Sequence, residues 1–141
     1  MKEIDQLKRT VNESSELSKK GEHLKALRLL DAAIAQAVQE NRSLWVRVLS
    51  RHASALADDM GDLQLVRRYR EQCLAEDPKN PMALSSLANV LQKQGEKKLA
   101  RQYAVEAYRL SSQRATELDR AVIQSLLQMW QKLSFMKKIE P

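Results

Sequence analysis

The stretch from Asn80 to Ser112, NPMALSSLANVLQKQGEKKLARQYAVEAYRLSS, predicts two short helices joined by a turn. Apolar residues recur at helical spacing in its first half, and Lys93 and Gly95 follow, as is usual at a helix C-terminus. The second half predicts a second apolar face. Its members are Leu99, Ala100, Tyr103, Ala104, Ala107, Tyr108 and Leu110. Small residues such as Ala88 and Ala100 lie where the helices would meet, so the stretch indicates a tight helical hairpin.

The same pattern occurs twice more upstream, around Gly21 and Gly61. The turn glycines are separated by 40 and then by 34 positions. A helix–turn–helix period of about 34 residues is typical of tetratricopeptide repeats. The chain resembles that family over about residues 3 to 112. The matching positions are Ala53, Gly61, Val66, Cys73 and Pro78, then Leu84, Leu87, Ala88, Leu91, Gly95, Ala100 and Ala107. The first repeat matches least, with Glu13 and Ser14 where a large and then a small residue are preferred.

We therefore expect an all-α protein, and the resemblance implies a right-handed α-solenoid of about seven helices. Three hairpins would span residues 3–40, 43–78 and 80–112, followed by a capping helix and short tail in residues 113–141. Three Gly and three Pro in 141 residues are too few for a loop-rich or all-β chain. A terminal helix that covers the last hairpin is what a stack of repeats needs for solubility.

Several boundaries are expected from local sequence. Ser43 is expected to cap the third helix, and the second helix is expected to run to Gln39, which would explain why the first glycine spacing exceeds the second by six. Residues 111 to 115, mostly polar, predict a short join. The last helix would then run from about Thr116 to Leu133, with Leu118, Val122, Leu126, Met129 and Leu133 along its apolar stripe.

Candidate catalytic groups are few, and we expect neither an enzyme nor a cofactor or metal site. Cys73 is the only cysteine and lies on the apolar face of a helix, where a thiol acts as a small hydrophobe. His23 and His52 are too far apart in the pattern to predict a shared site. No phosphate loop or metalloprotease motif is present. With no long apolar segment and no disulfide pair, the sequence predicts a soluble, cytoplasmic protein.

The resemblance implies that the first helix of each hairpin lines a concave groove for a peptide or helix of a partner protein. Apolar and polar residues mix on the exposed faces of these helices. The expected groove residues are Lys8, Val11, Ser15, Val48, Arg51, Asp58, Met82, Ser85, Asn89, Gln92 and Lys93.

Positive charge is concentrated near the C-terminus. Residues 1–40 hold seven basic and seven acidic side chains, and residues 41–79 hold seven and six, whereas residues 80–141 hold ten and five. This excess indicates either a solvated face or a docking surface for an acidic partner or a phosphate backbone. A possible C-terminal contact surface combines aromatic and basic residues. It comprises Trp130, Lys132, Phe135, Lys137 and Lys138.

Three functional classes follow from these features. The favoured class is a protein-binding module, such as an adaptor, a co-chaperone or a secretion-type chaperone. Chaperones of bacterial secretion systems reach this size with three repeats, but they tend to be acidic, unlike this C-terminal half. The alternatives are a basic helical repeat that binds nucleic acid, which the few aromatic residues disfavour, and a scaffold that self-associates through its C-terminal helix. The sequence is also compatible with a homo-oligomer.

Overall fold

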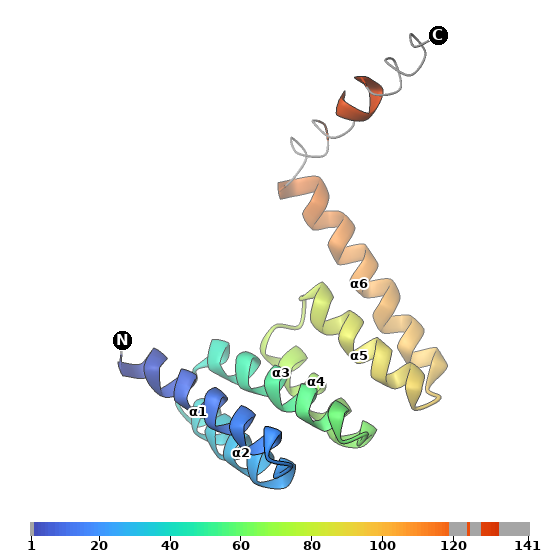
Figure 1. Ribbon diagram of the computed structural model, residues 1–141. Coiled ribbons are helices and arrows are strands. Elements are labelled where there is room, and N and C mark those ends of the chain that lie inside the picture. Colours follow the sequence, from blue (N-terminus) through green and yellow to red (C-terminus); the bar gives the residue numbers. More distant parts are fainter. Residues whose placement is uncertain (1, 119–123, 125–127, 133–141) are drawn as a thin grey trace, which may run out of the picture. The chain divides into compact units, whose positions relative to one another are not determined.

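The fold is all-α, as the sequence predicts. The computed structural model describes residues 2–118, 124 and 128–132. Within residues 2–118 six helices follow one another in chain order, and Figure 1 shows them in sequence. They are α1 (Lys2–Lys19), α2 (His23–Gln39), α3 (Ser43–Asp59), α4 (Leu63–Glu76), α5 (Pro81–Lys93) and α6 (Lys97–Leu118). Residues 128–132 are also helical.

The chain divides into two compact units, Met1–Ala107 and Tyr108–Pro141. Within the first unit α1 packs on α2, α2 on α3, α3 on α4 and α4 on α5, so each helix from α1 to α4 contacts the next along the chain. A single apolar core runs through these helices, with Leu30, Leu49, Tyr69, Leu87 and Leu91 fully buried. Consecutive packing of helical hairpins around one continuous core is the arrangement expected of a helical repeat.

Each hairpin turn is closed by a glycine in the left-handed conformation. At the third turn Gly95 has φ +85°, and the N–H of Glu96 donates to the carbonyl of Leu91 at 3.0 Å. The same bond pattern ends α2, where Asn41 takes the glycine's place with φ +56° and the N–H of Arg42 donates to Ala37 at 2.9 Å. These bonds satisfy helix carbonyls that would otherwise lack a partner.

We expect Gly95→Ala to lower the free energy of unfolding by about 1–2 kcal/mol, the usual cost of the left-handed conformation for a residue with a Cβ. A Cβ at Gly95 would meet no atom within 4 Å, so backbone strain alone sets the loss. Asn41→Gly is the matched control and should raise stability slightly. Urea unfolding measures both changes, and an unchanged midpoint for Gly95→Ala would rule out this turn geometry.

The connection between α4 and α5 is held by side chains. Asn80 caps α5 by accepting from the N–H groups of Met82 and Ala83 at 2.9 and 3.4 Å, and its amide donates to Asp77 at 3.2 Å. Arg47 of α3 pairs with Asp77 at 3.5 Å. Because Pro81 stands at the first helical position, the start of α5 is set locally.

Three local expectations were wrong. Arg42 occupies the N-cap position of α3 without a side-chain cap bond, so Ser43 is inside the helix. The expected join at residues 111 to 115 is helical, because α6 runs on to Leu118. Tyr108 was expected on the apolar face of its helix but is exposed. The buried positions of α6 are Ala100, Ala107 and Leu110.

The extra length between the first two turn glycines comes from two helices. The second helix does end at Gln39, as expected, and α2 has 17 residues where α4 has 14. However, α3 also has 17 residues where α5 has 13. The extra length is therefore shared by α2 and α3 and is not carried by α2 alone.

Tyr69 joins α4 to α2 at the centre of the core. Its hydroxyl donates to Asp31 at 2.7 Å, and the guanidinium of Arg68 lies 5.0 Å from the ring centre. Burial, followed by the hydrogen bond to Asp31, raises the pKa of Tyr69 from 10.0 to about 12. The folded state therefore keeps this phenol protonated where the unfolded chain would ionise it.

A pH dependence follows from the Tyr69 hydroxyl. Below pH 10 both states are protonated and its stabilisation is complete; between pH 10 and about 12 only the unfolded state ionises, so the stabilisation is lost as pH rises. We expect the stability advantage of the wild type over Tyr69→Phe to shrink by about 1–2 kcal/mol between about pH 9 and pH 11.5. Denaturant melts at both values measure it. An advantage that is constant or grows would show that the hydroxyl is not held protonated.

Candidate binding site

The first helices of the hairpins, α1, α3 and α5, expose a repeated set of side chains. We call the surface that includes Ile4, Leu44, Val48 and Met82 the first-helix face. Val48 of α3 and Met82 of α5 are separated by 34 positions, and Ile4 of α1 and Leu44 of α3 by 40 positions. These are the spacings of the turn glycines, so each pair occupies equivalent helical positions. The first-helix face is therefore built by the repeat itself.

Large apolar side chains are exposed near the N-terminal ends of these helices. Ile4 is 55% exposed, Leu44 59% and Met82 74%, and Val48 is less exposed. Towards the other ends the exposed residues are polar, among them Asp58 and Lys93. Clustered exposed apolar residues with a polar border are typical of surfaces that bind another protein.

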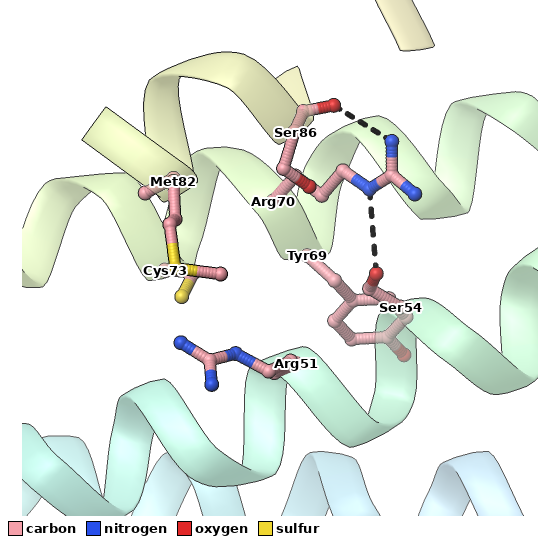
Figure 2. A pocket seen from close by; sticks show the side chains of 8 residues that line it. Arg51, Ser54, Tyr69, Arg70, Cys73, Met82 and Ser86 are labelled. Carbon is pink, nitrogen blue, oxygen red and sulfur yellow. Dashed lines mark hydrogen bonds between the residues drawn. The ribbon is translucent and has the colours of Figure 1, made fainter. Parts of the chain in front are cut away.

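A cavity of about 210 Å³ opens between α3 and α5 and is floored by α4. Its walls combine apolar groups with two arginines (Figure 2). The lining residues are Arg51, Ser54, Tyr69, Arg70, Cys73, Met82, Ala83 and Ser86. By contrast, α1 packs directly against α3, where the hydroxyl of Ser15 lies 3.3 Å from Nε2 of His52.

The two arginines of the cavity differ in how they are held. Arg70 bridges the walls, because it donates to the backbone carbonyl of Ser86 at 2.7 Å and to the hydroxyl of Ser54 at 3.5 Å. The guanidinium of Arg51 lies on the side of Cys73 and Met82 and has no hydrogen bond or ion pair to the described residues (Figure 2). Arg51 can therefore bind an anionic group of a ligand without breaking a hydrogen bond or an ion pair to the described residues.

Cys73 contributes a buried thiol to the floor of the cavity. Burial raises the pKa of its thiol, although Arg51 and Arg47 oppose that shift, and its Sγ is 3.8 Å from the carbonyl of Arg47. A neutral, buried thiol acts as a small hydrophobe, as the sequence predicts. Burial also lowers the pKa of His52, because it disfavours the charged imidazolium.

The structure places the expected groove residues in different surroundings. Arg51 and Met82 line the cavity together. Val11 packs against the core and Ser15 against α3, so neither is fully open. Val48 lies on the apolar part of the first-helix face. Three residues of α5 line a separate groove between α5 and α6, and three more are exposed outside both hollows. The first group is Ser85, Asn89 and Gln92, and the second is Lys8, Asp58 and Lys93.

The floor of the cavity was missed from sequence because it comes from a second helix. Tyr69, Arg70 and Cys73 belong to α4, and the expected groove used first helices only. One signal was present in the sequence: Arg70 interrupts the apolar face of α4, and the residue 34 positions later is Ala104. A charged residue at a position that is alanine in the neighbouring repeat marks a local departure from the repeat.

The expected C-terminal contact surface is described only in part. Trp130 is 72% exposed and Lys132 is exposed, while Phe135, Lys137 and Lys138 lie outside the described residues. Of the apolar stripe assigned to the capping helix, Met129 is exposed. Capping and self-association through this segment stay predictions. Among the described helices none has the length and apolar character needed to cross a bilayer.

Comparison with known proteins supports the fold. No family model and no curated protein matches the chain. A solved structure does match: the crystal structure of the Yersinia enterocolitica type III secretion translocator chaperone SycD, in an alternative dimer form. The TM-score is 0.56 with 18% sequence identity, over 96% of each chain. At this identity the match shows a shared tetratricopeptide-like helical architecture.

Proposed function

We propose that this protein is a non-enzymatic protein-binding module of adaptor or chaperone type. It holds a segment of a partner protein on the first-helix face, with one apolar side chain of that segment inserted into the cavity between α3 and α5. The observation that carries this proposal is that exposed Met82 lines a largely apolar cavity, while Val48, at the equivalent position of α3, is also exposed. The chaperone role in the name of the similar structure and the resemblance to tetratricopeptide repeats support the same function.

Arg51 adds a charge requirement to the partner segment. Because its guanidinium faces the cavity without a partner among the described residues, a carboxylate beside the inserted apolar residue would form an ion pair there. Such a pair at the rim of an apolar contact fixes register and orientation more than it adds affinity. The bound segment is thus expected to carry an Asp or Glu next to its apolar anchor.

Capture from a native extract tests this function. We expect the double variant Val48→Glu/Met82→Glu to lose the partner that wild type retains, because two carboxylates would replace the apolar contacts and repel an acidic segment. Leu24→Glu, which changes an exposed leucine of α2, is the matched control and should retain it. Captures are repeated after nuclease treatment, because a basic chain also retains nucleic acid. A partner held equally by all three proteins would contradict binding at the first-helix face.

A further inference from the structure

A second hollow lies between α5 and α6, on the last hairpin of the first unit. Its volume is about 400 Å³, and small residues form its floor. Polar residues of α5 border one side, and two cations of α6 border the other. The lining residues are Ser85, Ala88, Asn89, Gln92, Lys97, Ala100, Arg101 and Ala104. We call this surface the last-hairpin groove.

The last-hairpin groove corresponds to a surface that is already occupied one repeat earlier. Ser85, Ala88 and Ala104 are the repeat equivalents of three residues that line the cavity beneath α5. Those earlier residues are Arg51, Ser54 and Arg70, each 34 positions before its counterpart. On that earlier hairpin the next helix, α5, packs against α4, and on the first hairpin α3 packs against α1 and α2. A hairpin of this chain therefore offers the shape on which a further helix packs.

α6 does not end at the repeat position where α4 ends. α4 ends at Glu76, and the residue 34 positions later is Leu110, yet α6 continues to Leu118. The positions of the Asp77–Asn80 connection are therefore helical in the third hairpin. The local turn that lays α5 on α4 therefore has no counterpart at residues 111–114.

Charge on the earlier hairpin indicates what a docked helix must carry. Arg67 of α4 pairs with Glu71 at 2.6 Å and with Glu96 at 2.8 Å, and Glu96 lies just beyond the C-terminal end of α5. The equivalent of Arg67 on the last hairpin is Arg101, and the equivalent of Glu71 is Val105. Arg101 is exposed and has no hydrogen bond or ion pair to the described residues. It lacks both carboxylates that its counterpart binds.

We infer that the last-hairpin groove is a second docking site, which takes an amphipathic helix of a partner protein. That helix packs small or apolar residues on Ala88, Ala100 and Ala104, and it presents a carboxylate just past its C-terminal end to Arg101, as Glu96 does to Arg67. The residues after Leu133 of this chain are Ser-Phe-Met-Lys-Lys-Ile-Glu-Pro, in which two lysines come before the one carboxylate, Glu140. The charge pattern therefore fits a partner better than this chain's own C-terminal segment.

The test uses the full chain and a synthetic peptide of residues 79–96, since this is the helix that the equivalent surface accepts. We expect fluorescence anisotropy to show binding that weakens about fivefold when the peptide carries Glu96→Lys, or when the protein carries Arg101→Glu, the usual range for an exposed ion pair and its reversal. Combining the two reversals should restore affinity. Lys20→Glu, an exposed change on the turn after α1, is the charge-matched control and should leave it unchanged.

Failure of the double reversal to restore binding would overturn the assignment of Arg101. Occupancy is measured with Asn89→Cys, whose thiol reaction rate reports access to the groove above the slow background of buried Cys73. A fast rate in the free chain, slowed by the peptide, supports a site for a partner. A slow rate at every protein concentration would mean that the chain covers its own groove. A rate that slows only at high protein concentration would mean that a second copy of the chain covers it. Either result overturns the proposal.

Discussion

Leu87→Ala is expected to lower the free energy of unfolding by about 2–5 kcal/mol, the usual range for truncating a buried leucine. Leu87 is buried in α5 and belongs to the core cluster that includes Val66, Leu91 and Ala100. Removing its side chain leaves a void beside α4 and α6 that these helices cannot close without breaking other contacts. Urea unfolding followed by circular dichroism measures the loss.

The control for Leu87→Ala is Leu24→Ala. Leu24 is an exposed leucine of α2, so the same truncation should cost less than about 0.5 kcal/mol. Comparable losses for the two variants would mean that α5 is not packed into a shared core. A loss below about 1 kcal/mol for Leu87→Ala would lead to the same conclusion.

Ala83→Leu is expected to weaken partner binding by at least about tenfold, because its added carbons would fill space that an inserted apolar side chain needs. Ala83 is half-buried and lines the cavity between α3 and α5. Filling an apolar cavity also adds contacts, so stability should stay level or rise. Isothermal titration with the captured partner segment measures the first effect and thermal melting the second.

Ala75→Leu is the matched control for the cavity-filling variant. Ala75 is an exposed residue of α4 that borders a different hollow, so its enlargement should leave binding unchanged. If Ala83→Leu binds as tightly as wild type at unchanged stability, the cavity does not receive the partner. If it unfolds the protein, Ala83→Val offers a smaller filling of the same space.

Most of the fold could be predicted from the repeat pattern. Gly21, Gly61 and Gly95 each close a hairpin because a left-handed residue is required there, and this requirement is visible in sequence as a glycine at a recurring spacing. Asn41 ends α2 in the same way, but asparagine occurs in many other settings, so its role was not recognised.

The continuation of α6 could not be predicted from polarity alone. Ser111 and Ser112 resemble a connection because they are polar, but a helix stops only where its backbone is blocked or its end is capped. The connection after α4 has Pro78, Asn80 and Pro81, whereas residues 111–114 have neither proline nor glycine. The helix therefore runs through these residues.

The cavity could not be predicted from sequence, because its prediction requires the distances between helices. Periodicity identified Arg51 and Met82 as exposed, because each lies opposite an apolar stripe. It did not indicate that α1 and α3 pack together while α3 and α5 stand apart, since that depends on how each hairpin tilts on its neighbour.

The most direct test of partner binding at the first-helix face is photo-crosslinking from that face. A photoreactive phenylalanine is placed at Met82, and the control protein carries it at Leu24 on α2; both sites are exposed. In native extract we expect the probe at position 82 to crosslink one protein, at a segment with an apolar residue next to a carboxylate. The probe at position 24 should not crosslink that protein. The same set of proteins crosslinked from both positions, or no crosslink from Met82, would contradict the first-helix face as the binding site.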